Sequence, residues 1–312
     1  MENTAEIARP GSFSCRAFMR DHLGTDMLLA SWLLLVSSAV YVGVICYYLT
    51  YAVDDYDDDF YFVNDLCLLF SAVAYLAGAG FFVYISYPDE LRKLMAEMER
   101  EMTDGSIEKM PFWERYVTGN SLLLATWLFL VATLPILVYP IWAYSIAYIT
   151  ALYFAVCIIA AFVVFLGLSL WVYACMPENL VKNEGRGSDV FARYVAPFIF
   201  CCASKEWITH HMSPDFLAGS WFFAAMAFFG VIGVIYLIAC YPSDFIYYLY
   251  FISVFLFFVG GFIFAWSSYP GANISSNTFY KMLCCDGAYE AEAVAGYSTE
   301  RTKLIPPSQS SA

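Results

Sequence analysis

Three of the segments that separate the long apolar runs of this chain contain no lysine or arginine. They lie around residues 54–59, Pro140 and Pro242. All 15 Lys and Arg residues fall before the first run, between the second and third, between the fourth and fifth, or after the sixth. Because cationic loops stay on the cytoplasmic side of a membrane, this alternation predicts an all-α, six-span polytopic membrane protein with both termini in the cytosol.

Charged residues are also scarce: they make up 14% of the 312 residues, against 61% hydrophobic residues, and the mean hydropathy is +0.63. This composition excludes an ordinary soluble domain. The net charge of −13 argues against a nucleic-acid partner, which needs a basic surface, and leaves the lipid bilayer as the expected partner. Each apolar run has the roughly 20 residues that cross a membrane as a helix. The runs are residues 27–53, 60–87, 121–139, 146–175, 216–241 and 245–269.

No motif for catalysis or metal binding is present. H-E-x-x-H, G-x-S-x-G, a P-loop and C-x-x-C are all missing, so we expect no enzymatic activity, no cofactor and no metal. His22 and His211 each stand four residues before an aspartate, Asp26 and Asp215. We interpret these as polar turns before helices rather than as zinc sites, which need a fuller ligand set. Asp26, Asn120 and Asp215 are the predicted N-caps of the odd-numbered spans.

The six runs repeat one two-span unit three times. Trp32, Trp127 and Trp221 are 95 and 94 residues apart, each early in an odd-numbered run, and the even-numbered runs close at Pro88, Pro177 and Pro270. Ten residues before each proline stands a glycine, and six before it an aromatic residue. The glycines, which we expect at close helix contacts near the midplane, are Gly78, Gly167 and Gly260. This pattern predicts three parallel hairpins related by a pseudo-threefold axis along the membrane normal.

The predicted organisation has seven parts. Two cytosolic linkers contain amphipathic helices, one with Leu91, Leu94, Met95, Met98 and Met102 at residues 89–103, and a weaker one at 189–202 with Val190, Phe191, Val195 and Phe198. The parts are a cytosolic segment (1–25), hairpin 1 (26–88), a linker (89–118), hairpin 2 (119–177), a linker (178–214), hairpin 3 (215–270) and a tail (271–312) that is largely disordered after about 286.

The hairpins have starts such as A-S-W-L and ends such as G-A-G-F-F-V-Y-I-S-Y-P. Such units resemble the YrhK-type membrane domain, here in three copies. The resemblance implies a two-span hairpin module and no chemistry, because the family has no defined activity.

Acidic residues gather in the first hairpin. Asp54, Asp55, Asp57, Asp58 and Asp59 lie in its non-cytosolic loop and Asp65 just inside the second span. They predict either a cation-attracting pore mouth or a hydrated acidic loop. No Lys, Arg, Glu or His lies at the midplane of any span, which disfavours ion-coupled transport.

Two functions remain open from the sequence. The first, which we favour, is a non-enzymatic membrane organiser or assembly subunit that binds other membrane subunits or further copies of itself. The alternative is a passive channel or permease for cations or small solutes. Weak polar stripes, such as Ser31-Ser38-Tyr41-Tyr48 and Asn64-Ser71-Tyr75, keep this alternative open.

The cytosolic linkers and tail carry two further signals. The pairs Cys201-Cys202 and Cys284-Cys285 lie near membrane boundaries, where they suit S-palmitoylation as well as unmodified thiols. Glu300, Leu304 and Ile305 match an acidic dileucine pattern that sorting adaptors bind in extended tails. We therefore expect an endosomal, lysosomal or vacuolar membrane, or the plasma membrane, and no glycan at Asn273, whose sequon faces the cytosol.

Overall fold

A computed structural model describes residues 21–52, 59–135, 138, 151–180, 188–269 and 278. These residues form helices and turns and contain no strand. The long helices are α2 (Asp26–Ala52), α3 (Asp59–Ser86), α7 (Ala151–Cys175), α11 (Asp215–Cys240) and α12 (Phe245–Ser267). The shorter ones are α4 (Pro88–Thr103), α5 (Ser121–Ala132), α8 (Pro177–Leu180), α9 (Ala196–Ile199) and α10 (Lys205–Met212), with a 3-10 turn η1 (Ile107–Lys109) and π turns η2 (Glu114–Thr118) and η3 (Phe191–Val195).

Five of these helices are long and apolar enough to cross a membrane. The qualifying stretches are Asp26–Thr50, Leu66–Ser86, Ile158–Cys175, Asp215–Cys240 and Phe245–Ser267. They are the predicted spans 1, 2, 4, 5 and 6, so the multi-pass membrane class is confirmed.

The predicted third span differs from the expectation of one uninterrupted helix. Its described helix α5 has 12 residues, too few to cross a core of about 30 Å, and ends at Ala132. Pro135 explains the break, because it has no N–H to bond the carbonyl of Val131 and it disfavours helix at the preceding residue. Most of residues 136–150 lie outside the described part, so a sixth span stays a prediction.

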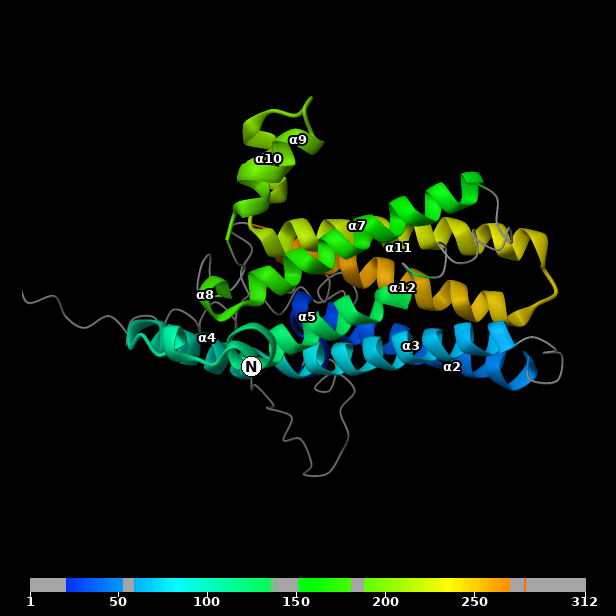
Figure 1. The fold of residues 1–312 in the computed structure, drawn as a ribbon, viewed down its shortest axis with the longest axis horizontal. Coiled ribbons are helices and arrows are strands. Elements are labelled where there is room, and N and C mark those ends of the chain that lie inside the picture. The colour runs from blue at the N-terminus through cyan, green and yellow to red at the C-terminus, as the bar shows by residue number, and fades with distance from the viewer. Residues whose placement is uncertain are drawn as a thin grey trace, which may run out of the picture.

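The helices form a closed ring in chain order. α2 contacts α3, α3 contacts α5, α5 contacts α7, α7 contacts α11, α11 contacts α12, and α12 returns to α2. Figure 1 shows α2, α3, α11 and α12 lying along the long axis of the molecule, with α7 crossing at an angle. The short helices α4, α8, α9 and α10 gather at one end, which we call the α4 end.

The first predicted amphipathic helix is present as α4. Leu91, Leu94 and Met98 are buried on one face, and Leu94 and Met98 belong to the bundle core. The helix therefore packs against the bundle through most of the apolar face that its sequence periodicity indicates, whereas Met102, also predicted on that face, is exposed.

The apolar face predicted for residues 189–202 is wrong in part. Phe191 is buried, but Phe198 is 85% exposed and Val195 is 38% exposed. The π turn at Phe191–Val195 changes the angular step between residues, so Ala192 and Ala196 lie beside Phe191 on the buried face.

Candidate functional site

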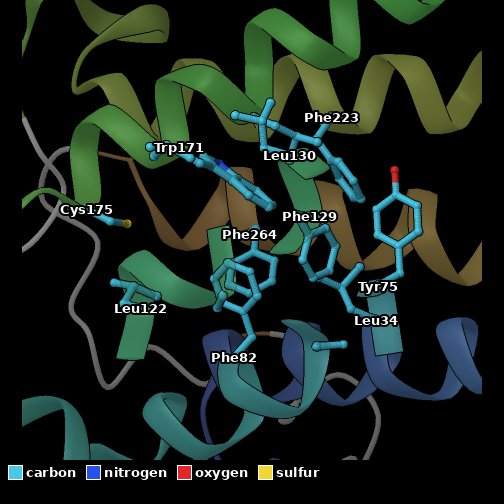
Figure 2. Close-up of a cluster of buried hydrophobic side chains, with 14 of the residues drawn as sticks. Leu34, Tyr75, Phe82, Leu122, Phe129, Leu130, Trp171, Cys175, Phe223 and Phe264 are labelled. Carbon is cyan, nitrogen blue, oxygen red and sulfur yellow. The ribbon is translucent and has the colours of Figure 1, made fainter. Parts of the chain in front are cut away.

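Three aromatic side chains from three helices meet at the centre of the bundle. Phe82 of α3, Trp171 of α7 and Phe264 of α12 are fully buried. Their ring centroids are 5.4 to 5.8 Å apart in every pairwise combination. Figure 2 shows these rings pointing toward one another from different helices. All three stand six residues before Pro88, Pro177 and Pro270, respectively.

Further rings fill the space around this trio. Phe129 of α5 lies 5.4 Å from Phe82 and 6.1 Å from Trp171, and Phe223 of α11 lies 5.2 Å from Trp171 (centroid distances; Figure 2). Phe129, Phe223 and Leu34 of α2 each follow a repeat-marking tryptophan by two residues, and all three are buried. We call Phe82, Trp171, Phe264, Phe129, Phe223 and Leu34 the axial cluster. The axial cluster fills the interior of the ring of helices at this level.

The buried indole of Trp171 is hydrogen-bonded. Its Nε1 donates to the hydroxyl of Ser220 at 3.1 Å and to the carbonyl of Phe216 at 3.2 Å. Both acceptors lie on α11, so the side chain ties α7 to α11 as well as filling the centre.

Each of the three predicted glycines lies against a helix of another predicted hairpin. A Cβ placed on Gly78 would lie 3.1 Å from the carbonyl oxygen of Ala125, and 2.6 Å from the ring of Phe129. A Cβ on Gly167 would lie 3.0 Å from the carbonyl of Gly219, and one on Gly260 would lie 3.2 Å from that of Ala30. A side chain at any of these positions would have to displace its neighbour.

The three carbonyls also share a sequence position. Ala30, Ala125 and Gly219 each stand two residues before Trp32, Trp127 and Trp221. The contacts join α3 to α5, α7 to α11 and α12 to α2. The second helix of each predicted hairpin therefore contacts the first helix of the next predicted hairpin around the ring of helices.

The serines of the predicted polar stripes are buried and hydrogen-bonded within the bundle, whereas the side chain of Asn64 lies outside the described residues. The hydroxyls of Ser31, Ser38 and Ser71 donate to the carbonyls four residues earlier in their own helices. Tyr41 stacks on Tyr250 at 6.0 Å, and Tyr75 packs 5.1 Å from Phe129.

A reciprocal pair of buried hydrogen bonds between two spans was not predicted. The Ser37 hydroxyl donates to the carbonyl of Ser253 at 2.7 Å, and the Ser253 hydroxyl donates to the carbonyl of Ser37 at 3.0 Å. This reciprocal pair joins α2 to α12. Serine within an apolar run is a signal for such a contact, but the run does not name the partner helix.

The predicted N-cap is correct for α5 and wrong for α2 and α11. Asn120 accepts from the N–H of Leu123 at 2.7 Å and donates to the carbonyl of Cys175 at 2.9 Å. At α2 the cap is Thr25, whose hydroxyl accepts from the N–H of Leu28, and at α11 it is Pro214. Asp26 and Asp215 are each the first residue of a helix instead.

Both aspartates are fully buried and bind an incoming segment of chain. The Asp215 carboxylate accepts from the Ser188 hydroxyl at 2.6 Å and from the N–H groups of Val190 and Phe191 at 3.3 and 2.8 Å. The Asp26 carboxylate accepts from the N–H of Thr278 at 3.1 Å. These carboxylates therefore hold the segments that follow α8 and α12.

Two of the three histidines, His22 and His211, each bond a tyrosine. His22 Nδ1 lies 2.6 Å from the hydroxyl of Tyr87, and His211 Nδ1 lies 2.8 Å from that of Tyr269. Burial raises the pKa of Tyr269, an effect that a hydrogen bond from Trp221 opposes, so the phenol stays protonated near neutral pH. No group of three His, Cys, Asp or Glu residues that could hold a metal ion occurs in the part of the chain that the structure describes.

Several predicted site residues lie outside the described residues. These are Asp54, Asp55, Asp57, Asp58, Pro270, Cys284, Cys285, Glu300, Leu304 and Ile305, and also the side chains of Asp59 and Asp65 in α3. Cys201 and Cys202 are described and exposed, with their Sγ atoms 3.8 Å apart.

No family model, curated protein or solved structure matches the chain. The resemblance to the YrhK-type domain therefore stays a prediction, and the functional argument depends on the geometry described above.

Proposed function

We propose that this protein is a six-span membrane protein built from three hairpins around a pseudo-threefold axis, with both termini in the cytosol. Two sets of equivalent contacts support the threefold relation. One is the three glycines, where an added Cβ would lie 3.0 to 3.2 Å from a carbonyl oxygen of the neighbouring helix, and the other is the trio of Phe82, Trp171 and Phe264. Contacts at equivalent sequence positions that each relate one hairpin to the next are what a triplicated unit would produce.

The orientation is supported by the described cations. All of them occur in residues 92–115 and 193–205, on the segments that join α3 to α5 and α7 to α11. Under the positive-inside rule, the α4 end is then the cytosolic end. A glycosidase-sensitive glycan at Asn273 of the parent protein would reverse this orientation.

We further propose that the protein is a non-enzymatic organiser or assembly subunit of its membrane. The observation that carries this proposal is the axial cluster, whose aromatic side chains and one leucine fill the centre of the ring of helices. A passive channel needs a continuous polar or hydratable path, and the cluster places buried apolar groups on that axis. The serines of the polar stripes, which are bonded within their own helices, also support the organiser over the channel.

An organiser also needs surface for other subunits or copies of itself. α11 presents large exposed apolar side chains along one side, namely Phe228, Phe229, Ile232, Ile235 and Tyr236. Such a face can bind lipid or a neighbouring span. We propose that it packs against a second membrane protein or a second copy of this chain.

The test combines flux with assembly. Protein reconstituted into liposomes should pass no more K⁺ than empty liposomes, and protein extracted in native nanodiscs should have a mass above that of one chain. K⁺ flux that falls at low salt when Asp54, Asp55, Asp57, Asp58 and Asp59 are all changed to Asn would establish the channel instead. A lone chain in every native nanodisc would overturn the assembly role.

The tail signal adds a proposed address. If Glu300, Leu304 and Ile305 bind sorting adaptors, the parent protein should reside in endosomal, lysosomal or vacuolar membranes. The double variant Leu304→Ala/Ile305→Ala should then move to the cell surface in imaging. An unchanged compartment would show that the pattern does not sort this protein.

A further inference from the structure

Residues 188–212, which contain η3, α9 and α10, form an arm at the α4 end of the bundle. Figure 1 shows α9 and α10 projecting sideways from the bundle, across the direction of α11, beside the end where α11 begins. If α11 crosses the membrane, an element with this direction lies along the membrane surface.

The inner face of the arm is firmly attached. Phe191 packs edge-to-face on Phe222 of α11 with ring centroids 5.3 Å apart, and the cluster around Phe191 also contacts Leu166 and Leu170 of α7. The Asp215 carboxylate binds Ser188 and two backbone N–H groups of the arm. The arm is therefore a packed part of the bundle.

These contacts also set its depth. Phe222 lies seven residues into α11 and Leu166 lies nine residues before the end of α7. At 1.5 Å per residue, they are about 10 and 14 Å along the two helices from the α4 end. The arm thus overlaps the first turns of α11 and the last turns of α7, reaching through the zone about 5–10 Å into the headgroup and acyl boundary where interfacial helices bury their apolar face.

The exposed side chains of the arm include four large apolar ones, beside the charged Arg193, Lys205 and Glu206. Phe198 is 85% exposed, Tyr194 61% and Ile199 50%, and Trp207 of α10 is 42% exposed. In water this surface would be costly, since each large apolar side chain gains about 1.5–3 kcal/mol on burial.

A second segment has the same feature. Trp113 stands fourteen residues before Trp127, as Trp207 stands fourteen before Trp221, and Trp113 is 69% exposed beside the exposed Phe112. Tryptophan is enriched at membrane–water interfaces. The recurrence favours lipid as the occupant, because a membrane surface meets every repeat at the same level whereas a protein partner need not.

We infer that the arm is an interfacial membrane anchor, whose outer face inserts Phe198, Ile199 and Trp207 into the cytosolic leaflet. Cys201 and Cys202, whose thiols are exposed, lie between Ile199 and Trp207 in the chain. That placement makes them the S-acylation site of the arm. The Cys Sγ attacks the carbonyl carbon of a fatty acyl-coenzyme A, a new thioester forms, and coenzyme A leaves as its thiol with the cysteine proton.

Lipid contact is tested by photo-crosslinking of the full chain in phosphatidylcholine nanodiscs. A benzophenone amino acid at position 198 should form lipid adducts about as efficiently as one at position 162, where Phe162 of α7 is 62% exposed, whereas position 97 on the outer face of α4 should form few. Adducts at 162 without adducts at 198 would overturn the anchor. Absence at both positions would instead overturn the proposed membrane crossing of α7 on which the inference rests, and the anchor with it.

Acylation is tested in cells by labelling with an alkynyl fatty acid and release with hydroxylamine. In a Cys284→Ser/Cys285→Ser background, the further change Cys201→Ser/Cys202→Ser should remove most of the remaining label, whereas Cys240→Ser should not. Label that is absent in the background protein, or unchanged by the double substitution, would overturn the acylation site while leaving the lipid-contact result to decide the anchor.

Discussion

The first and third of the predicted hairpins differ from the second in how their α4 ends are held. In the first and third, a fully buried aspartate, Asp26 or Asp215, binds the backbone of an incoming segment. The corresponding residue of the second hairpin, six before its tryptophan, is Ser121. There the cap Asn120 links α5 to the carbonyl of Cys175, and Arg115 forms an ion pair with Glu178 of α8.

The histidine–tyrosine pairs follow the same division. His22 and His211 stand ten residues before their tryptophans, and the corresponding residue of the second hairpin is Val117. The partners Tyr87 and Tyr269 precede the closing prolines, where the second hairpin has Met176. The glycine contact and the central aromatic side chain are present in all three predicted hairpins. The packing in the membrane interior is therefore more alike from hairpin to hairpin than the polar contacts at the helix ends are. A polar contact at a helix end can be replaced by another, but a close backbone approach tolerates only a small residue.

The largest effect should come from removing the buried carboxylate of the third hairpin. Asp215→Ala leaves the Ser188 hydroxyl and two N–H groups without their acceptor, and a buried unsatisfied donor costs about 1–3 kcal/mol. We expect about 3 kcal/mol or more of destabilisation in SDS-titration unfolding of the detergent-solubilised protein. Ser121→Ala should stay within about 0.5 kcal/mol of the parent. Equal effects at the two positions would contradict the division between the hairpins.

The glycine contacts should behave alike in all three hairpins. Gly78→Leu, Gly167→Leu and Gly260→Leu should each destabilise by about 1–3 kcal/mol through overpacking, measured in the same unfolding titration. Gly233→Leu in α11 is the control, since a Cβ there meets nothing within 4 Å. If the three variants unfold at the same SDS concentration as the parent, the glycines are not close-packing positions.

The capping residues should give intermediate effects. Asn120→Ala removes a cap and leaves the Cys175 carbonyl without its side-chain donor, so we expect a loss of about 1–2 kcal/mol. Thr25→Ala removes a cap bond at α2 and should cost about 1 kcal/mol. A Thr25 effect as large as that of Asn120 would show that the inter-helix bond to Cys175 adds nothing.

The smallest effect should come from the histidine–tyrosine pairs. A double-mutant cycle on His211→Phe and Tyr269→Phe should give a coupling of about 0.5–1.5 kcal/mol, the net value of one hydrogen bond. A cycle on Val117→Ala and Tyr269→Phe, one position in the first linker and the other in the third hairpin, is the control and should be additive. Additivity in the His211–Tyr269 cycle would show that the 2.8 Å contact contributes no stability.

Sequence periodicity located features that repeat locally and missed features that depend on a neighbour. The ends of α2, α3, α7, α11 and α12 lie within a few residues of the predicted runs at the described positions, because hydropathy is a property of each segment. The caps at Asp26 and Asp215 were wrong because their carboxylates bind other segments of chain. The break before Pro135 had a sequence signal that the hydropathy of the run concealed.

The sequence by itself determined which segments are apolar enough for a membrane, where prolines end them, and which residues recur at glycine and tryptophan positions. Only the tertiary structure decided that Gly78 meets Ala125, that Gly260 meets Ala30, and that Phe82, Trp171 and Phe264 share one centre. The physical reason is that transfer into lipid is a sum over single residues, whereas helix pairing depends on shape and hydrogen bonding between residues far apart in the chain.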